Sequence, residues 1–471
     1  MPRKDRPHVV ISGGGVAALE ALLALRVLVG HSVRITLVAP QPDFVVRPLS
    51  VAEPFDRGEA RKLALHDIAI DQGASLVPDS LSRVDVAGHA IETLGERRLE
   101  YDALIVATGA VPTEPLPGAT TFRGPQDVEP LRGVLDDIVS GAAHSAAFVV
   151  PADTAWSLPL YELALMAGAH VRAEGINSAA LTVVTPEAEP LQAFGPAAGH
   201  ALRELLAERG IALRVRAQPD RVDATGLVLA GGDRIPADRV VTVSVLEGPG
   251  VPGLPADARG FLRVDGHGRV EGAKDVYAAG DVTAHPLKQG GLAAQQADAV
   301  AEAIAAWAGA AIEPQPFRPV LRGLLLTGGV PVYLRSEPGR MAPEPTVATK
   351  AATRPRIRPA SSVKSTQALW WPPGKIAGRY LAPYLATARP PRLGSAPMID
   401  RAAIAGSSAS DAGRQDALEL AAILADEDAR WGDYASALRA LEAVEALEGT
   451  LPPEYEHKRR LWAAELTAVE R

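Results

Sequence analysis

The sequence has 471 residues, 47% of them hydrophobic and 22% charged, a composition typical of folded proteins that excludes disordered and collagen-like chains. It contains no cysteine, which excludes disulfides, cysteine-ligated metals, iron–sulfur clusters and thiol catalysis. The net charge of −8 at pH 7 argues against general nucleic-acid binding, and the length predicts about two to four domains.

The first pattern, over residues 8–38, is a strand, a glycine turn, a helix and a second strand. Residues 9–11 are β-branched, residues 16–29 have helical apolar spacing, and residues 33–38 again favour a strand. The apolar stretch before the glycines is too short for a signal peptide, and no apolar run reaches the ~18 residues of a membrane span. We therefore expect a cytoplasmic protein.

The turn of this unit carries the spacing Gly13-x-Gly15-x-x-Ala18, which matches the dinucleotide-binding fingerprint in its expected context. Gly13 permits a tight turn, Gly15 lets backbone approach a pyrophosphate, and Ala18 allows close packing of helix on strand. The N-terminus of the helix offers free N–H groups to phosphates. Ala39 stands where an acidic ribose ligand is expected, so a glycine turn without a ligand is the alternative.

The next two elements come from residues 101–110 and from residues 146–171. The first is a strand ending in Ala107-Thr108-Gly109, where small residues allow a second close approach to a ligand. The second is a strand, a turn and a helix, and residues 181–213 repeat that order, which predicts another unit of the same kind.

The turn of this second unit differs from a nucleotide-binding turn. It contains no glycine but holds Pro151, Asp153, Trp156 and Pro159. Proline removes an N–H donor, aspartate repels a pyrophosphate, and tryptophan fills the space that the backbone should leave open. We expect no ordinary dinucleotide binding there, and we expect Glu162 and Glu187 to be structural or solvated.

Residues 270–307 predict a strand, an Ala-Gly-Asp turn at 279–281 and a long alanine-rich helix. Asp281 has the position and chemistry to accept hydrogen bonds from a ribityl chain, and the start of the helix can face negative charge on a flavin. Three strand ends rich in small residues, at Gly13–Gly15, Ala107–Gly109 and Gly280–Asp281, together predict an FAD site.

The C-terminal region predicts a β-hairpin about Gly328-Gly329, then a Pro- and Arg-rich loop. Residues 335–392 hold eleven basic and two acidic residues, and Trp370 and Trp371 lie among them. Two interpretations stay open: peripheral contact with a membrane, or packing of the tryptophans on the flavin domain, which we favour because prolines interrupt any long helix.

The final residues form a tail after a linker. Residues 387–413 have linker composition, and residues 414–471 have helical spacing in three segments. The stretch 431–434, with Ala437 and Leu441, resembles one tetratricopeptide repeat, and a third helix begins near Pro452. One repeat cannot bury a core alone, so we expect the tail to dock on the body, on a second copy in a homodimer or on another protein.

Taken together, the three glycine-containing motifs resemble the FAD-dependent pyridine nucleotide–disulfide oxidoreductase superfamily. Its branch of sulfide:quinone oxidoreductases and type II NADH dehydrogenases is the most similar over residues 8–385. The loop 43–55 resembles the one that carries an arginine near the flavin, here Arg47, and residues 285–297 resemble the helix start that places a lysine near the isoalloxazine, here Lys288. The resemblance implies an α/β fold with two Rossmann-like domains, the second inserted in the first.

The resemblance also implies a division of the chain and a set of site residues. Domains are expected at 1–124 with 255–315 (FAD-binding), 125–254 (second Rossmann-like), 316–386 (flavin-covering), 387–413 (linker) and 414–471 (helical tail). Expected cofactor ligands are Gly13, Gly14, Gly15, Val16, Ala18, Arg47, Ala107, Thr108, Gly109, Gly280, Asp281, Lys288 and Gly291. Lys288 and His285 are the expected catalytic residues, and no histidine spacing suits a metal.

The functional hypothesis follows from these motifs and from the missing cysteines. An FAD-dependent oxidoreductase would pass electrons through its flavin from a small-molecule donor, with NAD(P)H one option, to a quinone or similar acceptor, without thiol chemistry. We expect it in the cytoplasm, with the inner face of the membrane as a further location. The alternative is a flavoprotein-derived interaction or sensor module whose helical tail binds a partner.

Overall fold

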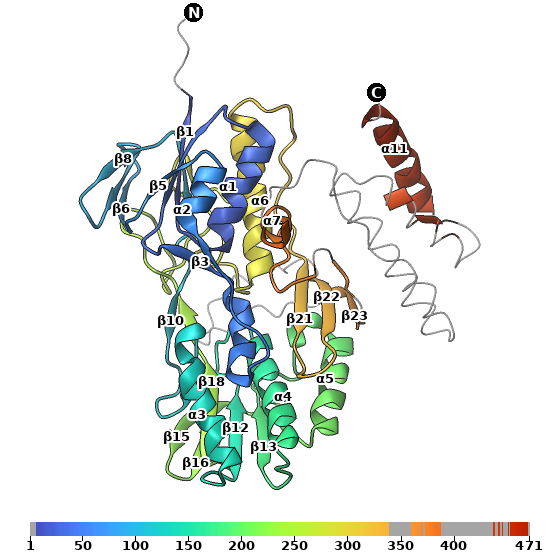
Figure 1. Cartoon of the computed structure of the whole chain (residues 1–471). Coiled ribbons are helices and arrows are strands. Elements are labelled where there is room, and N and C mark those ends of the chain that lie inside the picture. Colours follow the sequence, from blue (N-terminus) through green and yellow to red (C-terminus); the bar gives the residue numbers. More distant parts are fainter. Residues whose placement is uncertain are drawn as a thin grey trace, which may run out of the picture.

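Two five-stranded parallel sheets form the core of the computed structural model, one above the other in Figure 1. The structure describes residues 6–338, 359–366, 368–370 and 373–387, and in the tail 437–438, 441–442, 445, 451 and 453–469. Both sheets carry helices on their faces, which confirms the α/β class with Rossmann-like units.

The first sheet joins strands from distant parts of the chain. Its order is β20 (Val276–Ala278), β9 (Ala103–Val106), β1 (His8–Ser12), β2 (Arg34–Val38) and β5 (Ser75–Val77), all parallel. Helices α1 (Val16–Val29) and α6 (Gly290–Trp307) pack against each other and share one hydrophobic cluster with the sheet. β1 is buried along its whole length, as expected of a parallel strand covered on both faces.

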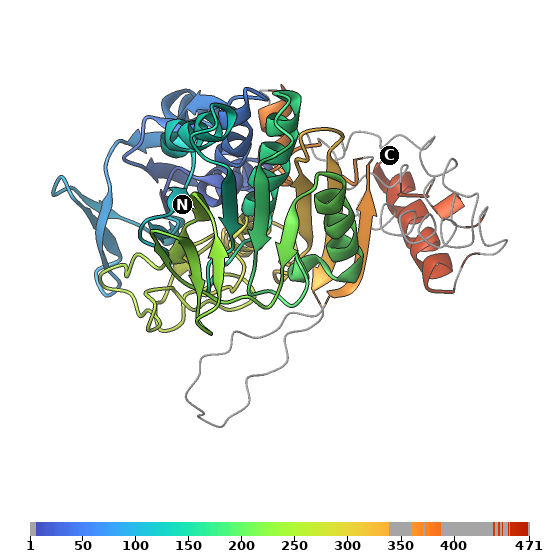
Figure 2. The ribbon, with the colours of Figure 1, turned by 90° about the horizontal axis from the view of Figure 1, so that it is seen from below.

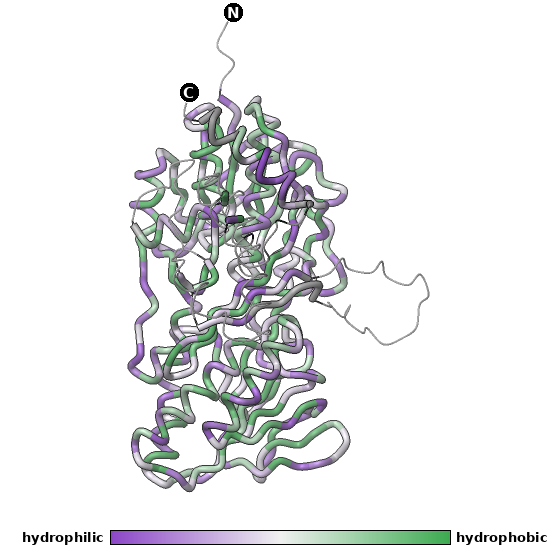
Figure 3. Tube along the Cα trace, turned by 90° about the vertical axis from the view of Figure 1, so that its right-hand side faces the viewer, coloured by the Kyte–Doolittle hydropathy of each residue, from purple (hydrophilic) through white to green (hydrophobic). Residues whose placement is uncertain are grey.

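The second sheet is built from residues between β9 and β20. Its order is β11 (Thr120–Phe122), β18 (Arg239–Val243), β12 (Ser145–Val149), β13 (Ala180–Val184) and β14 (Ala212–Arg214). Helices α3 (Val128–Val139), α4 (Leu158–Ala173) and α5 (Pro196–Glu208) surround it, and their apolar faces pack in a second cluster. In Figure 3, apolar and polar stretches alternate along the trace of both units.

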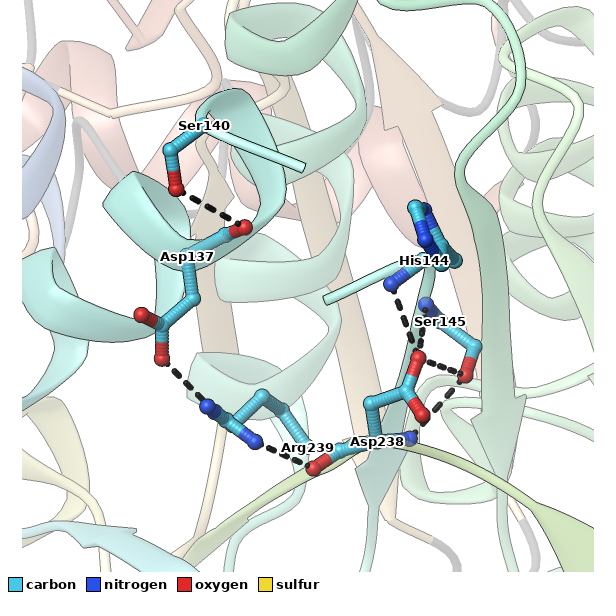
Figure 4. Close-up of polar contacts among 6 residues, drawn as sticks. All are labelled: Asp137, Ser140, His144, Ser145, Asp238 and Arg239. Carbon is cyan, nitrogen blue, oxygen red and sulfur yellow. Dashed lines mark hydrogen bonds and ion pairs between the residues drawn. The ribbon is translucent and has the colours of Figure 1, made fainter. Parts of the chain in front are cut away.

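A polar network fixes the beginning of β12 beside β18 (Figure 4). The Asp238 carboxylate accepts the N–H groups of His144 at 2.8 Å and Ser145 at 3.0 Å, and the Ser145 hydroxyl at 2.9 Å. The neighbouring Arg239 forms an ion pair with Asp137 of α3, with Nε 2.7 Å from the carboxylate. One short loop therefore ties two strands and a helix together.

Smaller elements extend the two sheets. The first unit carries β3 (Asp43–Val45) paired with β4 (Lys62–Ala64), a 3-10 helix η1 (Arg47–Phe55), α2 (Leu65–Asp71) and the antiparallel sheet β6 (Leu81–Asp85), β7 (Ala90–Thr93) and β8 (Arg98–Glu100). The second unit carries η2 (Pro125–Asp127), η3 (Gln192–Phe194) and the sheet β15 (Pro219–Asp223), β16 (Gly226–Leu229) and β17 (Arg234–Pro236). Between the units, β10 (Val111–Thr113) pairs with β19 (Val245–Glu247).

The C-terminal element is an antiparallel sheet followed by a short helix. β21 (Leu321–Leu325) pairs with β22 (Val332–Pro338), which pairs with β23 (Pro359–Ser365), and α7 (Leu381–Thr387) follows. The predicted hairpin about Gly328-Gly329 is therefore confirmed. Figure 2 shows these strands along one side of the molecule beside α5.

Trp370 is buried, donates its Nε1–H to the Gly374 carbonyl at 3.0 Å and packs edge-on against Tyr333. Its described partners Leu324, Tyr333 and Leu369 all belong to the C-terminal element, so Trp370 packs within that element, and the expected packing on the flavin domain stays a prediction. Trp371, residues 339–358 and the linker from residue 388 lie outside the described residues, so the prediction of membrane contact through 335–392 stays open for them.

In the tail, helix α11 (Pro453–Val469) begins at the place where the third segment was expected. Ala437 and Leu441 are buried. Most of 414–450 lies outside the described residues, so the resemblance to a tetratricopeptide repeat stays a prediction.

Candidate functional site

The site begins where three strands of the first sheet end side by side. The N–H of Ala107, just after β9, donates to the Ser12 carbonyl at 2.7 Å, and the N–H of Ala279, just after β20, donates to the Val106 carbonyl at 3.1 Å. The three segments that the sequence marked as glycine-containing strand ends therefore lie at one edge of one sheet. In parallel α/β sheets this carboxyl edge is where nucleotides bind.

Two glycines of the first turn have different structural roles. Gly13 has a φ of +132°, and a Cβ added there would lie 2.1 Å from the Ala107 carbonyl oxygen, so the turn leaves no room for a side chain. Gly15 has an ordinary φ of −93°, and no atom of the described residues lies within 4 Å of its added Cβ. Gly15 therefore borders open space.

The open space lies at the N-terminus of α1. Gly15 is the cap residue of that helix, and no side chain caps it. The first N–H groups of a helix lack intrahelical partners and carry partial positive charge, so this end suits a phosphate. The remaining predicted residues here are packing positions: Gly14 lies against Leu65, and Ala18 is fully buried, whereas Val16 lies beside Gly290 of α6.

The third strand end is held close to α1 by small residues and by one polar side chain. Gly280 has a φ of +83°, and its added Cβ would lie 3.0 Å from Cβ of Ala17. Its N–H donates to Oε1 of Gln296 at 2.7 Å, and the Thr283 hydroxyl lies 3.3 Å from the same oxygen. Gln296 was not among the expected site residues, although a polar residue in an alanine-rich helix was a visible signal.

Asp281 and Arg47 are the polar side chains that remain available at this edge. Neither the Asp281 carboxylate nor the exposed Arg47 guanidinium makes a hydrogen bond or ion pair with the described part of the chain. Burial raises the pKa of Asp281, while the positive charges of Lys288 and Arg47 oppose that rise. Both side chains are therefore free to bind a hydroxyl or a phosphate.

The two predicted catalytic residues have contacts of their own. The Lys288 ammonium donates to the carbonyl of Asp281 at 3.0 Å and to that of Thr283, and it lies 3.9 Å from the centre of the Phe261 ring. His285 contacts the backbone of Leu287 through Nδ1, and burial lowers the pKa of its imidazole. The geometry gives Lys288 a role in fixing the turn, and a catalytic role for either residue stays a prediction.

The N-terminus of α6 closes the other side of the site. Gln289 caps this helix by accepting the Leu292 N–H at 2.9 Å, and its Nε2 donates to the Arg322 carbonyl at 2.8 Å. Gly291 packs beneath the Gln289 side chain. A Cβ on Gly290 would lie 3.7 Å from Ile376, so the C-terminal element reaches the point where α1 and α6 begin.

Two buried carboxylates attach that C-terminal element. Glu20 of α1 accepts the N–H groups of Tyr380 at 2.7 Å and Leu381 at 2.8 Å. Glu162 of α4 accepts the Leu326 N–H at 2.7 Å and forms an ion pair with Lys375. Thr108 and Gly109 follow β9, and a Cβ on Gly109 would meet no described atom within 4 Å.

Over the described residues, no group of three or more His, Asp or Glu side chains is arranged to hold a metal ion. A search of the described helices also finds none with the length and hydropathy needed to span a bilayer.

Comparison with known proteins finds a matching family model and several similar proteins. The family model described as pyridine nucleotide-disulphide oxidoreductase matches residues 7–306. An NADH dehydrogenase-like protein of Mycobacterium tuberculosis is 28% identical over 59% of this chain and 73% of its own length. Rhodocoxin reductase of Rhodococcus erythropolis is 28% identical over 59% of this chain and 65% of its own.

Solved structures share the fold at lower identity. The sulfide:quinone oxidoreductase of Aquifex aeolicus superposes with a TM-score of 0.66 and 19% identity, covering 76% of this chain and 86% of that one.

Proposed function

Because the chain belongs to the pyridine nucleotide-disulphide oxidoreductase family, we propose that it is an oxidoreductase that binds FAD at the carboxyl edge of its first sheet. The observation that carries this proposal is the open space at Gly15, bordered by an uncapped helix N-terminus and three adjacent strand ends. The residues present fit the cofactor, because the backbone supplies donors for a pyrophosphate and no described atom lies within 4 Å of a Cβ added at Gly15.

Each of the residues named at the carboxyl edge of the first sheet has a proposed role. The first N–H groups of α1 would bind the pyrophosphate, Arg47 would offset its charge, and Asp281 would accept hydrogen bonds from ribityl hydroxyls. Lys288 and Gln296 hold the 280–283 turn in place. The start of α6, capped by Gln289, would offer its partial positive charge to the bound cofactor.

When bound, FAD supplies the two-electron or one-electron chemistry that no side chain of this protein provides. The chain has no cysteine, so no thiol of this protein would relay electrons between the cofactor and a diffusible partner. We propose a quinone or a similar small molecule as the acceptor, reached under the C-terminal element that begins at β21. This assignment is supported by the likeness to a protein named sulfide-quinone reductase, which is 24% identical over 59% of this chain.

Substitution of Gly15 tests the FAD site. Gly15→Val adds a Cβ that meets no described atom within 4 Å, so the variant should fold but bind FAD at least about tenfold more weakly. The matched control is Gly133→Val in α3, where an added Cβ also meets nothing within 4 Å. FAD affinity is measured by flavin fluorescence on refilling the apoprotein.

Two results contradict the proposal: a purified protein that neither contains nor takes up FAD, or equal FAD affinity of the two variants. The first result would instead favour an interaction or sensor module. A protein that binds FAD, is reduced by dithionite and is reoxidised by a soluble quinone has the proposed activity.

A further inference from the structure

The second sheet has its own candidate nucleotide crevice, and its contents are unusual. In a Rossmann-like unit, a dinucleotide lies across the carboxyl ends of the first two strands and places its pyrophosphate at the N-terminus of the helix between them. The corresponding elements here are β12, β13 and α4. That crevice is occupied by the bonded side chain of Glu187, by a turn with bulky residues and by strand β21 of the C-terminal element.

A carboxylate already lies at the N-terminus of α4. The Glu187 carboxylate, which follows β13, accepts hydrogen bonds from the hydroxyls of Ser157 at 3.3 Å, Thr185 at 3.2 Å and Tyr161. Ser157 is the cap residue of α4, and Tyr161 lies in its first turns. The space beside the helix end that would receive a phosphate is therefore occupied by a bonded side chain of the protein itself.

The same carboxylate is unavailable to a ribose. In dinucleotide-binding units an acidic residue after the second strand binds ribose hydroxyls. Glu187 is in that region, but it also accepts the N–H of Gln192 at 3.2 Å, so both of its oxygens already have partners in the protein. Binding of a ribose to Glu187 would require some of these hydrogen bonds to be broken.

The turn between β12 and α4 is filled with bulky residues. Trp156 stands where a glycine turn would leave space, and its ring packs edge-on against Phe194 of η3 with centroids 5.5 Å apart. Pro159 lies in the first turn of α4 and removes one N–H donor. Asp153 in the same turn has a φ of +56° and carries another negative charge.

The C-terminal element covers what remains. A Cβ added to Gly323 of β21 would lie 2.5 Å from the Phe194 ring and 3.3 Å from Leu158, the first residue of α4, so this strand packs directly on the crevice. Glu162 in the second turn of α4 binds Lys375 and the Leu326 N–H. The helix that would hold a nucleotide therefore holds the C-terminal element.

We propose that the second Rossmann-like unit is closed to NADH and NADPH and serves as the anchor of the C-terminal element. Trp156 and Glu187 are the residues that exclude the nucleotide. The proposal rests on the proposed function, since it limits which donors can serve the same flavin. Any electron donor must then reach the flavin without docking on this unit.

The first test titrates NADH and NADPH calorimetrically into the full chain loaded with FAD. We expect no saturable binding up to roughly 1 mM, the upper end of usual Michaelis constants. A micromolar dissociation constant for either nucleotide overturns the proposal. The FAD content of the same sample is read from its visible spectrum, so loss of the FAD site, which would defeat the proposed function, is distinguished from nucleotide binding at the second unit.

The second test asks whether the named side chains cause the closure. The double variant Trp156→Gly, Glu187→Gln is compared with Trp307→Gly, Glu189→Gln, which alters an exposed tryptophan and an exposed glutamate. We expect ADP-ribose to bind the first variant at least about tenfold more tightly than the control. Equal binding overturns the assignment to these residues. Should the double variant fail to fold, the ADP-ribose affinity of Glu187→Gln alone is compared with that of Glu189→Gln.

Discussion

One proton in a buried carboxyl pair affects the stability of the whole fold. Asp298 of α6 and Glu20 of α1 lie together, and the charged groups around them are Arg379 and Glu302. Burial and the neighbouring Glu20 raise the pKa of Asp298 well above its usual value. The folded protein therefore keeps a proton that the unfolded chain releases near pH 4, at about the ordinary pKa of aspartate.

Asp298→Asn should make this dependence visible. Because the folded state binds more protons than the unfolded state, the free energy of unfolding falls as the pH rises from about 4 through the raised pKa. Asparagine keeps a donor for Glu20 and cannot ionise, so the variant should melt at a higher temperature than the wild type at about pH 8, with a difference that shrinks toward pH 4. Thermal unfolding across this range is the measurement, and a pH-independent difference would argue against the shared proton.

Asp238 shows the opposite effect, since the folded structure lowers the pKa of its carboxyl group. Hydrogen bonds from the N–H of His144 and from the hydroxyl and N–H of Ser145 lower the pKa of Asp238 (Figure 4). Its stabilisation is present above the unfolded pKa of about 3.9 and is lost as the pH falls through the lower folded pKa.

Asp238→Asn should therefore be less stable than the wild type at neutral pH and should approach it in acid, because the wild-type carboxylate loses its advantage once it is protonated. Thermal unfolding of both variants over the same pH range is the measurement. Opposite pH trends of the two variants are the expected result, and parallel trends would contradict both assignments.

Neither carboxyl could be assigned a pKa direction from the sequence, because each direction depends on partners brought together by the fold. The N–H of His144, which is the chief cause of the lowered pKa of Asp238, lies far from that residue in the chain. Gly13 and Gly15 show the same limit. Their spacing predicted the turn, but only the structure separates the glycine that avoids a backbone clash from the glycine that borders open space.

At the scale of elements, local patterns predicted the regular parts well. The helix expected over residues 16–29 has those bounds in the structure, because its apolar spacing and the preceding glycines are local features. The second unit's strand and helix were also expected, but Pro159, which was expected in the turn, lies in the first turn of α4, because proline is tolerated there. The contact of α4 with the C-terminal element was not predictable, since it joins residues far apart in the chain.

The ion pair between Glu162 and Lys375 allows the contribution of that contact to the free energy of unfolding to be measured. Both side chains are almost fully buried, so Lys375→Met leaves the Glu162 carboxylate without its cation in a dry environment. We expect a loss of about 3–5 kcal/mol in the free energy of unfolding. The double variant Glu162→Gln, Lys375→Met removes both charges and should lose much less, because replacing a buried pair by neutral groups is often close to neutral.

Urea unfolding of the two variants measures this difference. The matched control is Arg203→Met, which breaks the exposed ion pair with Glu189, since loss of a surface pair costs at most about 1 kcal/mol. Equal losses in the single and double variants would mean that the two charges do not compensate each other.

At the scale of the whole molecule, the C-terminal element joins two units that the sequence predicted separately. Glu20 attaches it to the first unit and Glu162 to the second. The sequence predicted a covering element from its resemblance to a family. Glu162 was expected to be structural or solvated, but the partners of either glutamate could not be predicted, because the partners of a buried carboxylate are fixed only by tertiary packing.

Removal of FAD should speed hydrogen exchange in the segments that border the proposed site and leave exchange in part of the second unit unchanged. A ligand at 100 times its dissociation constant stabilises the folded state by about 2.7 kcal/mol, and that stabilisation disappears with the ligand. Hydrogen exchange should become faster in the apoprotein at residues 13–18, 107–109 and 280–291, which border the proposed site. The sheet of β15, β16 and β17 belongs to the second unit and is the internal control, where exchange should stay the same. Faster exchange in that sheet alone would place the cofactor elsewhere, because a ligand protects most strongly the segments that it touches.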